Sequence, residues 1–206
     1  MPMIGRIRDM ALTSDSALRP RVDRLLLLCS LGAAACSNVG GIDATKVATV
    51  SNEDAYATLG GIWNGARAAI TSPREPRTPT FTLPISFTRN CPAGGQSSYQ
   101  GTLTGTDTAG TGSATVALTA VLANCAFDDR TRVTTVSATG VSIAGTIAIS
   151  SDTYGAINLR LIATSVIVNG KDCTGGINMA LQGSSPLAQP TASGTVCGRS
   201  GVVPLP

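Results

Sequence analysis

Phe81-Thr-Leu-Pro-Ile-Ser-Phe-Thr88 indicates the fold class, because apolar residues stand at every second position of this stretch. Such alternation is typical of a β-strand with one buried face and one face in water. Later stretches rich in Val, Ile and Thr continue the series, and turn residues separate them. These stretches are 115–122, 133–137, 141–149, 157–168 and 177–181. Because no helical periodicity lies between them, we predict a mainly β fold, an antiparallel meander that forms a sandwich or an open barrel.

A helical pattern precedes the β series. Ser51 can serve as an N-cap, and acidic residues follow it in the first turn. The next apolar residues recur at spacings of three and four and therefore share one helix face. They are Tyr56, Leu59, Trp63, Ala66 and Ile70. Gly60 and Gly61 would each weaken an isolated helix by about 1 kcal/mol relative to alanine. We therefore expect one N-terminal amphipathic helix over residues 51–72 that packs on the apolar face of the sheet.

Turn and breaker residues mark further boundaries. Residues 73–79 contain three prolines, which end the helix and begin an extended connection to the first strand. Asp107-Thr-Ala-Gly110 and Asp152-Thr-Tyr-Gly155 have the composition of hairpin turns, so each is expected to form a hairpin tip. We assign residues 80–206 to one antiparallel β domain.

The N-terminal region has the features of a secretory signal. Basic residues precede an apolar run, 25–35, that ends in three alanines before Cys36. The run is too short for a transmembrane helix, which needs about 20 residues. We therefore predict a signal peptide over 1–35, with either Met1 or Met10 as its start, and a flexible tether over 36–50.

Ala33-Ala34-Ala35-Cys36 resembles the lipobox of bacterial lipoprotein precursors, although that family usually has Leu at the position of Ala33. The resemblance implies cleavage before Cys36, acylation of this cysteine by fatty acids such as palmitate, and attachment to a membrane. Ser37 follows the cysteine where an inner-membrane retention signal has Asp, which favours an outer-membrane lipoprotein facing the periplasm or the cell surface. Cleavage after Ala35 by the ordinary signal peptidase, with plain secretion, is the alternative.

Four further cysteines predict two disulfides in an exported chain. Cys91-Pro-Ala-Gly94-Gly95 and Cys173-Thr-Gly175-Gly176 both place a glycine pair after a cysteine and before a strand pattern. A later cysteine follows each of them, Cys125 and Cys197 respectively. Pairing 91–125 and 173–197 would therefore close two equivalent local units. A zinc site is the competing interpretation, and no close CxxC pair supports it.

Composition argues against several classes of function. The chain has no histidine, which removes the commonest general base and the commonest metal ligand. Removal of residues 1–35 leaves ten basic and nine acidic residues, without a basic cluster that would suit nucleic acid. We therefore predict no enzymatic activity, no cofactor, no metal and no nucleic-acid partner.

Two functions remain open on this basis. The first is a non-enzymatic cell-envelope lipoprotein whose β domain is a structural or interaction module for an unknown partner. The second is a carrier of a small apolar ligand. Gly61-Ile62-Trp63 is similar to the Gly-x-Trp signature at the start of lipocalin barrels, and Asp152-Thr-Tyr154 is faintly similar to their second motif. A cavity lined by Trp63, Leu118 and Ile147 would favour the carrier, whereas a filled core would favour the interaction module.

Overall fold

The computed structural model describes residues 43–44, 50–72, 79–128, 132–150, 153–186 and 188–206. The chain divides into two units, 1–37 and 38–206, and every described residue belongs to the second. The predicted signal peptide, Cys36 and the proline-rich connection up to residue 78 lie outside the described residues. Of the predicted tether, the structure describes the short strand β1 (Asp43–Ala44) and Val50, whose side chain is buried.

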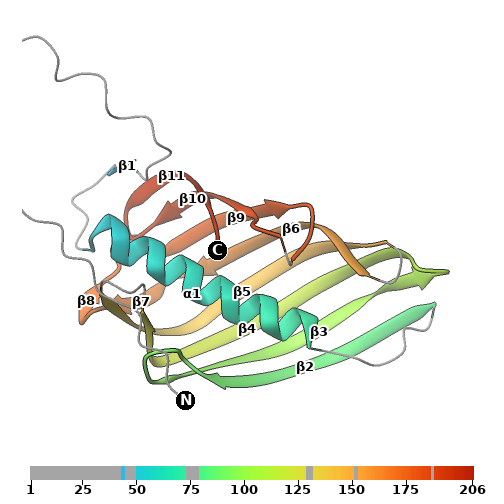
Figure 1. Ribbon diagram of the computed structural model, residues 1–206, viewed down its shortest axis with the longest axis horizontal. Helices are drawn as coiled ribbons and strands as arrows, with labels where there is room; N and C mark the ends of the chain where they lie inside the picture. Colours follow the sequence, from blue (N-terminus) through green and yellow to red (C-terminus); the bar gives the residue numbers. More distant parts are fainter. Residues whose placement is uncertain (1–42, 45–49, 73–78, 129–131, 151–152, 187) are drawn as a thin grey trace, which may run out of the picture. The chain divides into compact units, whose positions relative to one another are not determined.

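The β-strands of the described residues form one open antiparallel sheet of eleven strands. The order across the sheet is β1-β11-β10-β9-β6-β5-β4-β3-β2, and a small β7–β8 hairpin extends from β5. The remaining strands are β2 (Thr80–Asn90), β3 (Gln96–Thr108), β4 (Thr111–Asp128), β5 (Val133–Ser150), β6 (Thr153–Ala163), β7 (Ser165–Val168), β8 (Lys171–Asp172), β9 (Ile177–Gly183), β10 (Thr191–Val196) and β11 (Arg199–Pro204). Figure 1 shows the long central strands lying side by side.

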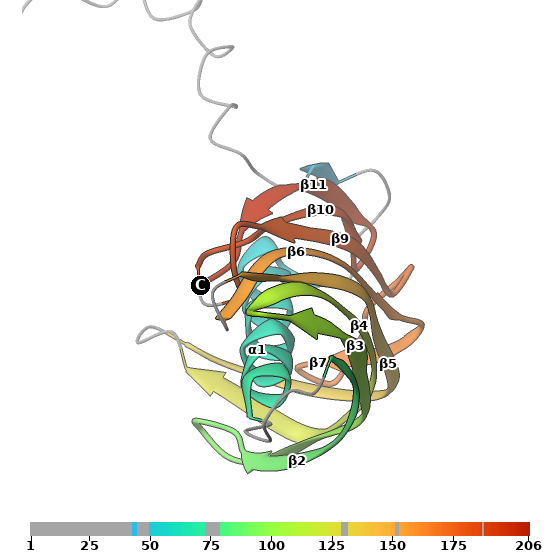
Figure 2. The same cartoon turned by 90° about the vertical axis from the view of Figure 1, so that its right-hand side faces the viewer.

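The sheet curves around α1 (Asn52–Thr71), the helix of the described part of the chain, which lies in its hollow (Figure 2). The Ser51 hydroxyl caps the helix by accepting a hydrogen bond from the Asp54 amide at 3.1 Å. Leu59, Trp63 and Ile70 on the inner face are completely buried. The predicted fold class is therefore confirmed, and of the two predicted closures the structure has the open barrel, with the helix filling its trough.

Close contacts with rings explain why α1 contains glycines. A Cβ atom at Gly61 would overlap the ring of Phe127, and one at Gly65 would overlap the phenol of Tyr99. The Tyr99 hydroxyl donates a hydrogen bond to the Ile62 carbonyl at 3.2 Å, so the ring is held against the helix. The glycines therefore cost helix propensity but let rings from the sheet reach the helix backbone.

The outer face of the sheet is polar but almost uncharged. Thr82 pairs with Thr104, Thr104 with Thr115, and Thr115 with Thr146, so threonines form a row across four neighbouring strands. All four are exposed. Their β-branched side chains suit strands, and their hydroxyls face water.

Both disulfides have the predicted pairing. Cys91 is bonded to Cys125 across 34 residues of sequence, and Cys173 to Cys197 across 24. The first disulfide ties the β2–β3 connection to β4, and the second ties the β8–β9 connection to the β10–β11 turn. Disulfides of this kind indicate an oxidising, extracytoplasmic compartment.

A proline protects the β2 edge of the sheet. The Asp107 amide donates to the Pro79 carbonyl at 3.1 Å, which places Pro79 in a hydrogen-bonded pair with β3. Hydrogen-bonded pairs alternate along an antiparallel ladder, so Pro84 directs its nitrogen to the open edge. Because proline has no N–H, the middle of this edge lacks a donor with which another strand could pair.

Several details of the strand prediction were wrong. Residues 133–137 and 141–149 belong to one strand, β5, whose pairing with β4 contains register shifts. Ala109 and Gly110 form the predicted first hairpin tip with positive φ, but Thr153, Tyr154 and Gly155 lie within β6 rather than at a tip. Strand β3 was not expected, because only two of its inward residues, Tyr99 and Leu103, are large and apolar.

Candidate functional site

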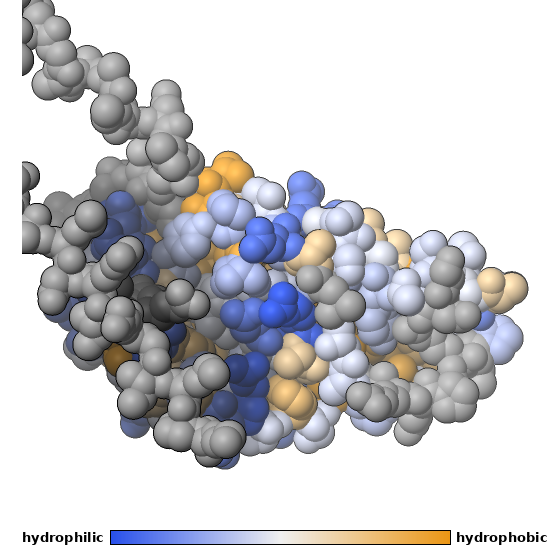
Figure 3. Space-filling view, in the orientation of Figure 1, coloured by the Kyte–Doolittle hydropathy of each residue, from blue (hydrophilic) through white to orange (hydrophobic). Residues whose placement is uncertain are grey.

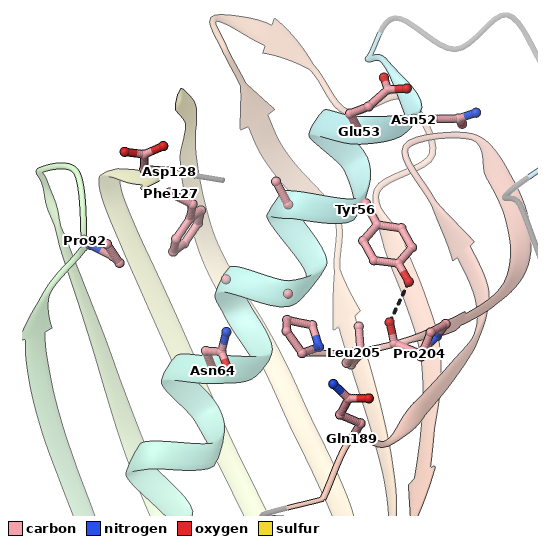
Figure 4. A pocket seen from close by; sticks show the side chains of 14 residues that line it. Asn52, Glu53, Tyr56, Asn64, Pro92, Phe127, Asp128, Gln189, Pro204 and Leu205 are labelled. Atoms are coloured by element: carbon pink, nitrogen blue, oxygen red, sulfur yellow. Dashed lines mark hydrogen bonds between the residues drawn. The ribbon is translucent and has the colours of Figure 1, made fainter. Parts of the chain in front are cut away.

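A groove with a volume of about 730 Å³ lies on the outer side of α1. Its floor is the outward face of the helix from Asn52 to Asn64, where Ala57, Gly60 and Gly61 present little side-chain bulk. Figure 4 shows this floor between two walls that come from distant parts of the chain. On the same side of the molecule, Figure 3 shows hydrophilic residues interspersed with smaller hydrophobic patches.

The first wall consists of Phe127 and Asp128 at the end of β4, together with Pro92 from the β2–β3 connection. Phe127 packs directly on the backbone of Gly61, so the ring closes this side of the groove down to the floor. The Cys91–Cys125 disulfide joins the segments that carry Pro92 and Phe127. This wall is therefore fixed by covalent and packing constraints.

The second wall is the C-terminal segment from Pro204 to Pro206, with Gln189 beside it. The Tyr56 hydroxyl donates a hydrogen bond to the Pro204 carbonyl at 2.6 Å, which joins the wall to the helix (Figure 4). The Leu205 amide donates to the Pro190 carbonyl at 2.8 Å, and the Leu205 side chain is buried. Two prolines and three hydrogen-bonding or packing anchors make this wall stiff as well.

The polar groups of the groove are amides and carboxylates. Asn64 accepts a hydrogen bond from the Arg67 guanidinium at 2.8 Å through its side-chain oxygen, which leaves its NH₂ group as a donor. Among the titratable residues of the lining, Glu53 and Asp128 are acidic and Tyr56 has a pKa raised by partial burial. No lysine or arginine is among the lining residues, and Arg132, outside the lining, forms an ion pair with Glu53.

Hydrogen bonds and an ion pair to the buried carboxylate of Asp54 hold the first turn of α1 below the groove. Asp54 accepts hydrogen bonds from Thr134 at 2.9 Å and from Ser51 at 2.8 Å, and Arg132 forms an ion pair with it at 3.3 Å. Arg132 also lies 3.7 Å from Glu53, whose side chain is more exposed than that of Asp54. Because Asp54 has a partner on each oxygen, its buried charge is compensated, and the network joins the helix N-terminus to β5.

The predicted ligand-binding residues lie elsewhere. Trp63, Leu118 and Ile147 belong to the hydrophobic core between helix and sheet, with exposed fractions of 0%, 3% and 0%. None of them lines the groove. The indole N–H of Trp63 is buried without a hydrogen-bond partner among the described residues. As a ligand site these residues remain an untested prediction, while their observed role is packing.

Sequence reasoning did not identify the groove. Its floor includes Gly60 and Gly61, whose low helix propensity is the property that the sequence reveals. Its walls, Phe127 and the segment Pro204–Pro206, come from positions far from the helix in the sequence. The glycine pair is therefore the one feature of the local sequence that indicates a close approach of rings to the helix at this point.

Three further findings bear on chemistry. Within the described part of the chain, no group of three or more His, Cys, Asp or Glu residues is placed to hold a metal ion. None of the described helices is both long enough and apolar enough to cross a membrane. Comparisons with protein-family models, with curated proteins and with solved structures found no match to this chain.

Proposed function

We propose that the protein is an exported, non-enzymatic envelope lipoprotein whose folded domain is an interaction module, with the groove over α1 as its contact surface. The observation that carries this proposal is the groove itself, a concave surface with two anchored walls and a floor of small residues. Concave, largely apolar sites with a few polar groups are the usual form of binding sites. The disulfides agree with export, and the lipobox-like sequence before Cys36 supports anchoring.

The rigidity of the groove favours recognition. Phe127 is packed on Gly61, and Pro204 is bonded to Tyr56, so neither wall has to be ordered when a partner arrives. A site that is already ordered avoids part of the entropic cost of association. The filled core between helix and sheet, which includes Trp63, also favours an interaction module over a carrier with an internal cavity.

The anchor is tested by replacing Cys36 with alanine and fractionating cells that express the full chain. The wild-type protein is expected in the membrane fraction, with an intact mass that includes acyl groups on Cys36. The Cys36→Ala protein is expected in the soluble envelope fraction. Recovery of this variant wholly with membranes, or a wild-type mass without acyl groups, would contradict the proposed anchor.

The contact surface is tested by site-specific photo-cross-linking in intact cells. A photoreactive residue at Asn64 is expected to form a discrete cross-linked product, because Asn64 lies on the floor of the groove. The same residue at Thr115, exposed on the opposite face of the sheet, serves as the matched control and should form none. Equal products at both positions, or none at Asn64, would contradict the assignment of the groove.

A carrier of a small apolar ligand is the second candidate. The groove volume of about 730 Å³ lies within the range of small-molecule sites, and rings form much of both walls. Native mass spectrometry of the protein purified from its host membrane distinguishes the two functions. A retained small molecule that Asn64→Arg releases would favour the carrier.

A further inference from the structure

We infer that the groove binds an extended, proline-rich basic peptide, and that the residue 73–79 segment of a second copy of this chain is its occupant. This inference rests on the groove being the contact surface proposed above. The chemistry of the partner follows from the walls of the groove, its charge, its length and the position of the segment in the fold.

The walls suit proline rings. Tyr56, Phe127 and Pro92 present ring surfaces, as do Pro204 and Pro206 across the floor. Grooves lined by aromatic residues recognise proline-rich segments, because the polyproline II conformation is already extended and loses little entropy on binding. A bare hydrocarbon would fit the rings but would leave the amides and carboxylates of the groove desolvated without partners.

The polar groups suit a basic peptide backbone. A polyproline II helix makes no internal hydrogen bonds, so its carbonyls need external donors. The side-chain NH₂ groups of Asn64 and Gln189 can supply these donors at the edge of the floor (Figure 4). Glu53 and Asp128 are the charged residues of the lining and both are acidic, which complements the arginines of a peptide, although Arg132 at 3.7 Å from Glu53 offsets part of this charge.

The chain itself contains such a peptide. Residues 73–79 read Pro-Arg-Glu-Pro-Arg-Thr-Pro, with a proline at every third position. Three residues make one turn of polyproline II, so the three prolines would share one face, the two arginines a second, and Glu75 and Thr78 the third. Seven residues at 3.1 Å each extend about 22 Å, which matches the roughly 18 Å of helix between Asn52 and Asn64.

Geometry favours a second copy over the same chain. The segment starts after Ser72 at the C-terminal end of α1, whereas the groove covers the N-terminal part of the helix. It ends at Thr80, the first residue of β2, and Pro92 of the groove follows the other end of that strand. Eleven strand residues span about 36 Å, which is more than a seven-residue segment tethered at both ends can reach. Ser72, which precedes the segment, and Pro79, its last residue, are both exposed.

A labelled synthetic peptide of residues 72–80 provides the first test, by fluorescence anisotropy with the mature protein. Saturable binding is expected, and Asn64→Arg should weaken it at least about tenfold, through bulk and like charge on the floor of the groove. Thr115→Arg adds the same charge on the opposite face and should leave the affinity unchanged. A peptide with alanine at its three prolines keeps the charge and should not bind. Absence of saturable binding, or equal binding to both variants, would overturn the inference.

Sedimentation velocity of the mature protein provides the second test. The wild-type protein is expected to self-associate reversibly, and Asn64→Arg should be monomeric. Pro76→Ala, which changes none of the groove-lining residues, should also be monomeric while the labelled peptide still binds to it. A monomeric wild-type protein would overturn the second copy as occupant. Cross-linking of Asn64 to a different protein would overturn this inference while leaving the interaction module intact.

Discussion

Replacement of Gly65 by alanine should destabilise the protein, although the same change inside an ordinary helix is stabilising by about 1 kcal/mol. The reason is the position of Tyr99, whose phenol occupies the space that a Cβ atom at Gly65 would need. Tyr99 is completely buried, so its ring has no solvent into which it can move. The helix would have to shift away from the sheet, or the ring would have to leave its packed position.

The magnitude follows from three contributions. Overpacking a filled core costs about 1–3 kcal/mol. Loss of the hydrogen bond from the Tyr99 hydroxyl to the Ile62 carbonyl, 3.2 Å long in the structure, costs about 1 kcal/mol more. The higher helix propensity of alanine offsets about 1 kcal/mol of this loss. We therefore expect Gly65→Ala to lower the free energy of unfolding by about 1–3 kcal/mol.

Urea unfolding of the oxidised mature protein, followed by the fluorescence of Trp63, measures this change. Ala57→Gly, on the outward face of the same helix, is the matched control and should cost only the propensity difference of about 1 kcal/mol. The double variant Gly65→Ala/Tyr99→Ala should lose less stability than the two single changes together predict, because each alone affects the same contact. A more stable Gly65→Ala protein, or strict additivity in the double variant, would refute the reasoning.

Four other outcomes are expected. Trp63→Ala should lower the free energy of unfolding by about 3–5 kcal/mol, because the indole is completely buried. An emission maximum of the native wild-type protein that is typical of exposed tryptophan would contradict this packing. Replacement of both Cys173 and Cys197 by alanine should cost about 3–4 kcal/mol in the same assay, and an unchanged urea midpoint would argue against the constraint. Pro84→Val should restore a donor to the open edge of the sheet and increase aggregation measured by light scattering, with Thr82→Val as the control for added hydrophobicity. Burial raises the pKa of Tyr99 from 10.0 to about 12. The stability of the protein should therefore be fully retained below pH 10 and fall as the pH rises toward 12. A pH profile of urea midpoints that is the same for Tyr99→Phe would contradict this.

The sequence was informative where local patterns determine structure. The N-cap Ser51 and the apolar spacing predicted the helix that the structure has as α1 (Asn52–Thr71). The repeated cysteine–glycine pattern predicted both disulfides, because equivalent units place their cysteines at equivalent positions. Strand β2 followed from strict alternation of apolar and polar residues.

Local sequence patterns did not predict the features that depend on contacts between distant segments of the chain. The inward positions of strand β3 include Gly101 and the buried Ser97 as well as Tyr99, and a Cβ atom at Gly101 would overlap the Ala117 carbonyl of β4. The groove depends on a hydrogen bond between residues 148 positions apart, Tyr56 and Pro204. Neither partner has a local feature that reveals the other, so the site could not be predicted from periodicity or composition.

The bonds between α1 and the C-terminal strand also set an order of events during synthesis and export. The helix is made before strands β2 to β11, yet the Val50 carbonyl accepts two hydrogen bonds from Arg199, and Tyr56 bonds to Pro204. Contacts between segments so far apart in the chain form slowly, because a long loop must close first. The apolar face of the helix can therefore pack on strands β2 to β5 as they form, whereas its N-terminal end is held in place only after the last strand has been made.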